Sequence, residues 1–185
     1  MLKKNNVVKM KIVTTPMCED ILKLAGVKDY AVNLNPDSTD SDIAVVLSET
    51  NTSMNSIKIK LNTFQQINQS VDLIRNSFGT SGSLNISGEK MFTEHKTENR
   101  KIKVKVYSNF LKDIVEDMGY SIATGDEYHH YLVYPDYIRD KILDEVISMG
   151  ENSVEIPSHK NSPKDPIKRA ELRYKLLEKK LCMKH

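Results

Sequence analysis

The sequence predicts an α/β protein, with a mixed and mostly parallel sheet flanked by helices, two related βαββ halves and a C-terminal helix. Residues 43–47, IAVVL, form a continuous apolar run of the kind that parallel sheets bury on both faces. Such runs alternate along the chain with apolar stripes at helical spacing. The segment KIVTTPMCEDILKLAG also aligns without a gap with the later segment VKVYSNFLKDIVEDMG, which indicates that one unit is used twice.

The first half begins with a strand, KIVTT. Thr15 is a good N-cap and Pro16 a good first helical residue, so a helix follows directly, and Gly26 ends it. Polar loops then separate three further predicted strands, at residues 30–34, 43–47 and 56–61.

The link to the second half is a helix after Thr63, which forms a capping box with Gln66. Its stripe consists of Phe64, Ile67, Val71, Ile74 and Phe78. Residues 84–100 are ambiguous: LNIS could be a short strand, and EKMFTEHKTENR is too polar to assign. Further strands are predicted at residues 102–107, 120–124, 129–134 and 154–156, and further helices after the cap residue Ser108, over residues 136–149 and after Asp165. The last helix carries an apolar stripe, with basic residues elsewhere: Ile167, Ala170, Tyr174, Leu177 and Leu181.

Composition narrows the class of protein. The 185 residues carry a net charge of +2, which is too balanced to indicate a nucleic-acid partner by itself, and nucleic acid is not the expected partner. The two cysteines, Cys18 and Cys182, lie at opposite ends, so a reducing cytoplasm is expected and a disulfide framework is not. No apolar run approaches the roughly 18 residues of a membrane span. We expect an N-terminal extension (1–10), one α/β domain (11–157) and a basic C-terminal helix packed on it (158–185).

Cys18 is the main candidate for chemistry. In the predicted helix it is about the third residue, where unpaired amides and the helix dipole favour a thiolate. The neighbouring Glu19 and Asp20 oppose this effect. The alternative is a small buried hydrophobe that packs on the sheet. The repeat aligns Cys18 with Leu111, so an apolar residue can fill the structural role of this position, which favours another reason for the thiol.

Three other segments are candidate sites. The loop GTSGS, residues 79–83, could present amides and hydroxyls to a phosphate, or simply connect two elements. The segment GDEYHH, residues 125–130, gathers carboxylates and imidazoles, but adjacent histidines on a strand point to opposite faces, so no metal site is predicted. The basic C-terminal helix could contact RNA or an acidic partner, although a solvated face is the commoner outcome.

Over residues 10–26, MKIVTTPMCEDILKLAG, the chain resembles the HcgF family of methanogens, the guanylylpyridinol-binding, thioester-forming proteins of mono-iron ([Fe]-)hydrogenase cofactor biosynthesis. In that family a cysteine just after the first strand attacks the activated carboxylate of guanylylpyridinol. The matching residue here is Cys18. The extension before Met10 departs from the family pattern.

The resemblance implies that the chain binds guanylylpyridinol, accepts its acyl group as a thioester on Cys18 and holds no permanent cofactor. Its implied partner is an adenylylating enzyme that resembles ubiquitin-activating enzymes; a homodimer is left open. The ligand-binding residues expected beside Cys18 are Thr14, Thr15, Pro16, Met17, Glu19, Gly79, Thr80 and Ser81. The alternative, from a different class, is a non-covalent nucleotide-binding or interaction protein in which Cys18 is purely structural.

Overall fold

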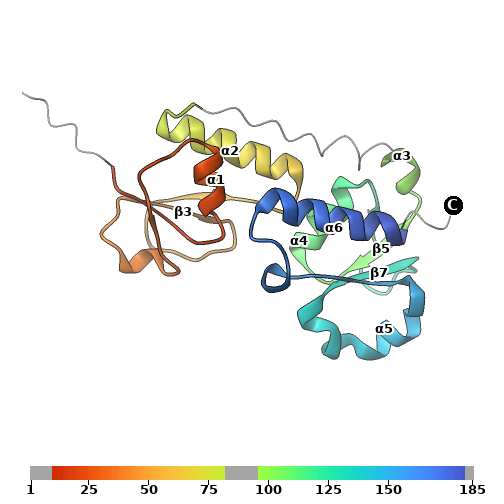
Figure 1. Cartoon of the computed structure of the whole chain (residues 1–185). Helices are drawn as coiled ribbons and strands as arrows, with labels where there is room; N and C mark the ends of the chain where they lie inside the picture. The colour runs from red at the N-terminus through yellow and green to blue at the C-terminus, as the bar shows by residue number, and fades with distance from the viewer. Residues whose placement is uncertain (1–9, 82–95, 182–185) are drawn as a thin grey trace, which may run out of the picture. The chain divides into compact units, whose positions relative to one another are not determined.

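The computed structural model describes residues 10–81 and 96–181, and Figure 1 shows the arrangement of their helices and strands. The chain divides into two compact units, each built on its own four-stranded sheet. The first unit contains the residues up to Lys60 and the segment that begins at Gln69, and the second contains Leu61–Asn68 and the C-terminal part. The predicted α/β class is confirmed, with two fully parallel sheets instead of one mixed sheet.

The first unit has the strand order β2-β1-β3-β4. Its strands are β1 (Ile12–Thr14), β2 (Ala31–Val32), β3 (Ile43–Leu47) and β4 (Ser56–Ile59). Its helices are α1 (Glu19–Leu24), the 3₁₀ turn η1 (Pro36–Ser38) and part of α2 (Phe64–Phe78), which contributes residues to both units. Val13, Ala44 and Val46 pack together on one face of the sheet, as the continuous apolar run of β3 predicts.

The second unit repeats this arrangement, with the strand order β6-β5-β7-β8. Its strands are β5 (Lys103–Val106), β6 (Ser121–Ile122), β7 (Tyr131–Pro135) and β8 (Ser153–Ile156). Its helices are α3 (Lys96–Asn99), α4 (Asn109–Asp117), α5 (Leu143–Met149) and α6 (Pro166–Leu181), with 3₁₀ turns η3 (Asp136–Ile142), η4 (Gly150–Asn152) and η5 (His159–Asn161). The shared strand order supports the repeat that the sequence indicates.

The two faces of the second sheet are covered differently. Leu132 and Tyr134 of β7 pack against Val146 of α5, together with Ile138 and Ile142. Lys105 is aligned with Leu132 in the parallel pairing of β5 and β7, so its side chain lies on this same face. The alternation of β5 thus puts a lysine beside a core that α5 and η3 cover.

Helix ends follow the predicted caps, with one exception. Ser108 Oγ accepts from Leu111 N, and Thr63 Oγ1 accepts from Gln66 N. Helix α1, however, begins at Glu19 and not at Pro16. Cys18 N donates to Thr15 O over 2.9 Å and closes a turn before the helix starts, so Cys18 is the N-cap residue.

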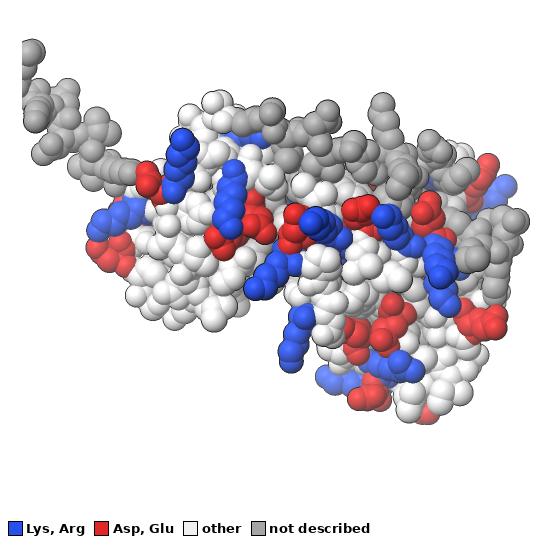
Figure 2. Space-filling model, in the orientation of Figure 1, with Lys and Arg blue, Asp and Glu red and all other residues white. Residues whose placement is uncertain are grey.

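The C-terminal helix buries apolar residues of its predicted stripe, and it also buries two of its basic residues. Ala170, Tyr174 and Leu177 are buried, and lysines along α6 lie among acidic side chains on the surface in Figure 2. Arg169 and Arg173 are buried too, where the sequence analysis expected basic residues on the solvent side. The guanidinium of Arg173 donates to Pro157 O instead. Among the helices described, none is long and apolar enough to cross a membrane.

Candidate functional site

The predicted site in the first unit lies at the carboxyl end of β1. Thr14 is buried, and its hydroxyl donates to Val45 O over 2.9 Å. The Thr15 hydroxyl lies 3.5 Å from Cys18 Sγ. The turn of Pro16 and Met17 leads from β1 to Cys18, and the Glu19 carboxylate pairs with Lys23 at 2.8 Å. Their role in binding a ligand stays a prediction.

Cys18 differs from its predicted environment in two respects. Its side chain is fully buried, with 0% exposure, and it makes no capping hydrogen bond to α1. It also precedes a helix of only six residues and does not lie within the first turn. The structure therefore agrees with the packing alternative for the site, since Leu111, its counterpart in the repeat, is also fully buried.

The loop that begins at Gly79 is not brought to Cys18. Thr80 N donates to Arg75 O and ends α2, and the Thr80 hydroxyl donates to Ala25 O over 2.5 Å. Thr80 thus lies at the C-terminal end of α1, whereas Cys18 precedes its N-terminal end. Ser81 approaches Gly26 at the same end of α1. The last two residues of the predicted phosphate loop, and Cys182, lie outside the described residues.

In the second unit, three ionisable side chains converge on one carboxylate. Glu145 of α5 pairs through Oε1 with Lys105 Nζ at 2.7 Å. The Tyr107 hydroxyl donates to Glu145 Oε2 over 2.5 Å. His129 Nε2 lies 3.8 Å from Glu145 Oε1. We call Lys105, Tyr107, His129 and Glu145 the Glu145 cluster.

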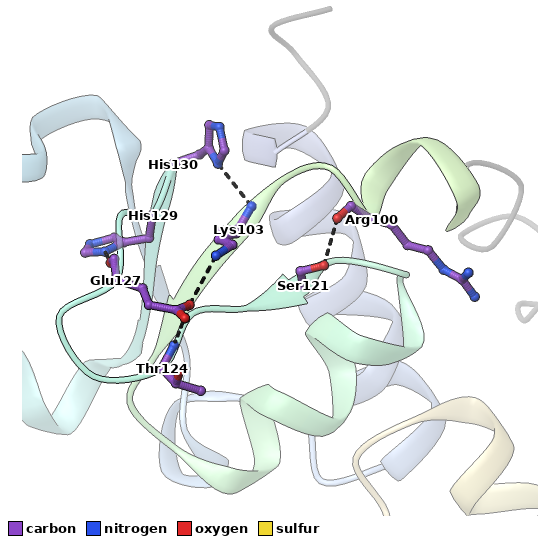
Figure 3. Close-up of polar contacts among 7 residues, drawn as sticks. All are labelled: Arg100, Lys103, Ser121, Thr124, Glu127, His129 and His130. Carbon is purple, nitrogen blue, oxygen red and sulfur yellow. Dashed lines mark hydrogen bonds and ion pairs between the residues drawn. The ribbon is translucent and has the colours of Figure 1, made fainter.

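The orientation of His129 comes from the segment before β7. Figure 3 shows His129 and His130 pointing apart, as the sequence predicts for adjacent histidines. His130 Nδ1 accepts from Lys103 N over 3.0 Å, and Lys103 Nζ pairs with Glu127 at 3.2 Å. His129 Nδ1 lies 3.1 Å from Glu127 O. These contacts hold the segment against β5. His129 lies beside Glu145 of α5, and His130 lies at the start of β5.

The hydrogen bonds of His129 define its tautomer. A carbonyl oxygen can only accept, so Nδ1 carries the proton that it donates to Glu127 O. In the neutral ring Nε2 then has a lone pair, and it is buried without a hydrogen-bond partner among the described residues. This lone pair and Glu145 Oε1 are two electron-pair donors 3.8 Å apart, which a cation between them would satisfy.

The cluster keeps its charges at neutral pH. Burial raises the pKa of Glu145, but hydrogen bonds from Lys105 and Tyr107 outweigh it, and the net pKa is lowered. Lys105 and Tyr107 each make a hydrogen bond to Glu145, and each bond raises the pKa of the residue that makes it. Glu145 is therefore a carboxylate, Lys105 an ammonium ion and Tyr107 a neutral phenol.

A cavity of 460 Å³ opens beside these groups. It is lined by Tyr107 and by the residues from Asp140 to Glu145. This volume is within the range of small-ligand sites, and Tyr107 follows the carboxyl end of β5, where parallel sheets commonly bind ligands. Of the four cluster residues, Tyr107 and Glu145 line the cavity, and Lys105 and His129 do not.

Sequence reasoning missed three of the four cluster residues. Lys105 and Tyr107 alternate with valines in KVKVY, which reads as the exposed face of a strand. Glu145 reads as one acidic residue among several in its helix. Only His129 was noted, within GDEYHH. The available signal was a lysine and a tyrosine on one face of a predicted strand. The helix that covers this face and supplies Glu145 could not be placed on it from residue spacing alone.

Comparison with known proteins shows structures with a similar fold but no relative in sequence. No family model matches the chain, and no curated protein is similar to it in sequence. A Zn(II)-bound variant of AdcAII of Streptococcus pneumoniae has a TM-score of 0.53 and 10% identity, over 94% of this chain and 99% of that one. The laminin-binding protein Lbp of Streptococcus pyogenes has a TM-score of 0.52 and 9% identity, over 94% of this chain and 100% of that one. The laminin-binding protein Lmb of Streptococcus agalactiae has a TM-score of 0.53 and 10% identity, over 94% of this chain and 100% of that one. It is described as a bifunctional protein with adhesin and metal transporting activity.

These findings correct the predicted family and function. The three structures named above are streptococcal laminin- and zinc-binding proteins, and no family model or curated sequence of the HcgF family matches the chain. The prediction of guanylylpyridinol binding, a thioester on Cys18 and an adenylylating partner is therefore wrong, and the nucleotide-binding alternative also finds no match. The error arose because a strand, a turn and a following helix in a parallel α/β unit impose a similar short pattern on unrelated sequences.

Proposed function

We propose that this chain is a solute-binding protein whose solute is a divalent transition-metal ion. The proposal draws on the fold shared with AdcAII, described as Zn(II)-bound, and with Lmb, described as having metal transporting activity. The observation that carries it in this chain is the pairing of His129 Nε2 with Glu145 Oε1.

The donor types suit such an ion. Imidazole nitrogen and carboxylate oxygen are common zinc ligands, and a ligating histidine typically donates its other ring N–H to a carbonyl or a carboxylate. His129 has this arrangement, with Nδ1 on Glu127 O. The ion would exchange the Lys105 ammonium on Glu145 for a metal–carboxylate bond.

The donor set is small, which limits the affinity. Within residues 10–81 and 96–181, no group of three or more His, Cys, Asp and Glu side chains is arranged to hold a metal ion. His129 and Glu145 supply two donors, and water would complete the coordination. Binding is therefore weaker than at a four-ligand structural zinc site, as suits a solute that must be released.

The test is a titration of the whole chain with Zn²⁺, with Mg²⁺ as a hard-cation control, followed by calorimetry and by the imidazole NMR signals. We expect Zn²⁺ to bind and to shift the His129 signals, and Mg²⁺ not to. His129→Ala and Glu145→Gln should each weaken Zn²⁺ binding about tenfold or more. Lys105→Met, which removes the competing ammonium, should strengthen it.

His130→Ala is the matched control, because its imidazole is adjacent in sequence but engaged with Lys103 N. It should leave Zn²⁺ affinity unchanged. Equal losses in His129→Ala and His130→Ala, or equal affinity for Zn²⁺ and Mg²⁺, contradict the proposal. The cytoplasmic location and the absence of a permanently bound cofactor stay predictions, which cell fractionation and elemental analysis of the purified protein test.

A further inference from the structure

Helix α5 has apolar side chains on two sides. On its inner side, Val146 and Met149 belong to the core that forms against β7. On its outer side, Leu143 and Ile147 are 44% and 68% exposed, and they lie one helical turn apart. A helix that covers a sheet needs only one apolar stripe, and a helix that is apolar all round is typically buried. The outer pair is therefore typical of a surface that a partner covers.

The outer pair belongs to a continuous apolar surface. Leu143 lines the 460 Å³ cavity beside the Glu145 cluster, and so does Tyr107, which is also exposed. We call Tyr107, Leu143 and Ile147, which extend from this cavity along α5, the α5 stripe. Isolated apolar side chains are common on protein surfaces, but a contiguous set beside a cavity is typical of an interaction site. The cavity can receive an apolar anchor from the partner.

Carboxylates border the α5 stripe. Asp140 and Asp144 are exposed and line the same cavity, and neither makes a hydrogen bond or an ion pair within the described part of the chain. Among the described lining residues, Lys141 is the cation, and it balances one of these two charges. The charge of Glu145 is already balanced by Lys105, at 2.7 Å. The surface around the α5 stripe is therefore negative.

We propose that the α5 stripe binds a basic, amphipathic segment of a partner protein. Apolar side chains of the segment pack on Leu143 and Ile147, and its lysine or arginine side chains pair with Asp140 and Asp144. A nucleic acid, an anionic lipid surface or an acidic segment meets like charge here, which selects against all three. None of the four residues that carry this inference is a donor to the proposed metal ion, so the inference does not rest on that function.

The experiment uses the full chain and three helical peptides of one pattern, built from lysine and leucine, from lysine and serine, and from glutamate and leucine. The anisotropy of the labelled peptide measures affinity, and the amide NMR signals of the ¹⁵N-labelled protein locate the contact. We expect the lysine–leucine peptide to bind at least about fivefold more tightly than either of the others, with saturable shifts at Leu143 and Ile147. Its affinity should fall as salt is added, because salt screens the charge pairs.

A matched pair of substitutions tests the apolar contacts. Leu143→Ser should weaken binding of the lysine–leucine peptide by about fivefold or more, whereas Leu73→Ser should leave it unchanged. Leu73 is the control because it has the same exposure, 44%, on the helix α2. Ile147→Ser should also weaken binding, at a more exposed position where the fold depends less on the side chain. Urea unfolding of each variant verifies that the fold is retained.

A second pair tests the charge. Asp144→Asn should reduce both the affinity for the lysine–leucine peptide and its salt dependence, whereas Glu49→Gln, at an exposed acid of the first unit, should change neither. Equal affinity for the lysine–leucine and glutamate–leucine peptides, equal effects of Leu143→Ser and Leu73→Ser, or amide shifts confined to other elements would overturn the inference. So would a dimer of the chain alone that Ile147→Ser dissociates, because a second copy would then cover the stripe.

Discussion

Cys18 and Leu111 occupy equivalent positions in the two repeated units, and both side chains are fully buried. In each unit the residue follows the first strand, but Cys18 precedes α1 whereas Leu111 lies in the first turn of α4. A thiol and an isobutyl group can fill the same place because a buried cysteine behaves as a small hydrophobe. The repeat thus assigns Cys18 a packing role that needs no thiol chemistry.

Alkylation of Cys18 should therefore be slow in the folded protein. We expect the iodoacetamide reaction rate at Cys18, read by peptide mass spectrometry, to rise in proportion to the unfolded fraction as urea is added. Cys18→Ala should retain the fold and lose about 1–2 kcal/mol of stability, the range for a small core truncation. Rapid labelling of Cys18 in the native protein, at the rate of a small-molecule thiol, is the result that this account excludes.

Gly119 should tolerate alanine much less well than Gly79. Both have positive φ, of +89° and +63°, so each alanine variant carries the left-handed penalty of about 1–2 kcal/mol. A Cβ at Gly119 would also lie 2.6 Å from Lys96 Cα, whereas nothing lies within 4 Å of one at Gly79. Urea unfolding of Gly119→Ala and Gly79→Ala should show a clearly larger loss for the first. Similar losses would mean that α3 does not pack on Gly119 in solution.

Local sequence signals predicted the elements well because each depends on near neighbours. The IAVVL run became β3 with its predicted bounds, and Ser108 caps α4. The gapless repeat predicted two related halves, although each half has its own parallel sheet and not a share of one mixed sheet. The candidate site was less predictable. His129 and Glu145 come together only because α5 covers one face of the sheet, and no local pattern encodes which face a helix covers.

The burial of Arg173 could not be predicted from the sequence either, because its partners are distant along the chain. Its carbonyl acceptor is Pro157, sixteen positions earlier, and its guanidinium lies 4.5 Å from the Phe110 ring centroid. In the sequence it is one of many basic residues in a helix with a solvated face. Only the packing of α6 distinguishes it from Lys175, which is exposed.

Acid should weaken the fold partly through Glu145. Its pKa is lowered below its ordinary value of 4.5, since hydrogen bonds from Lys105 and Tyr107 outweigh the effect of burial. A depressed carboxyl pKa stabilises the folded state above the ordinary value, and this contribution is lost as the pH falls through the folded-state pKa. Urea unfolding at pH 7 and at pH 3.5 should therefore show a smaller loss for Glu145→Gln than for the wild type.

The exposed Glu116 provides the control for this measurement. Glu116→Gln should lose as much stability on acidification as the wild type. If Glu145→Gln behaves like Glu116→Gln at both pH values, the hydrogen bonds at Glu145 contribute nothing to the pH dependence.

Replacing Arg173 should be costly although the side chain is charged and buried. Burial lowers the pKa of Arg173 to about 10, an effect to which Arg169 adds and which Asp136 opposes, so the group stays protonated at neutral pH. Arg173→Met removes the two N–H groups that donate to Pro157 O, so that carbonyl loses both of these hydrogen bonds. We expect a loss of about 1.5–3 kcal/mol in urea unfolding, and almost none for the exposed control Lys179→Met. Equal stability of the two variants would place Arg173 in solvent.

The C-terminal helix should be part of the folded core. Tyr174 packs its ring on Phe64 with centroids 5.0 Å apart, and its hydroxyl donates to Asp117. Ala170, Leu177 and Leu181 are buried beside it. Deleting residues 163–185 should lower the melting temperature, because each large buried side chain contributes about 1.5–3 kcal/mol. Tyr174→Phe alone should cost about 1 kcal/mol through the lost hydrogen bond.

Charge reversal on the outer side of the same helix should have little effect on stability. Lys168 is exposed, and Lys175 makes only a surface ion pair with Glu171, at 2.6 Å. Surface pairs of this kind are worth about 0.2–1 kcal/mol, so Lys168→Glu with Lys175→Glu should melt close to the wild type. Calorimetry of the truncated and the charge-reversed proteins separates the two sides of the helix. A truncated protein that melts like the full chain, or a charge-reversed one that melts like the truncation, would show that the apolar stripe of α6 does not hold the helix to its unit.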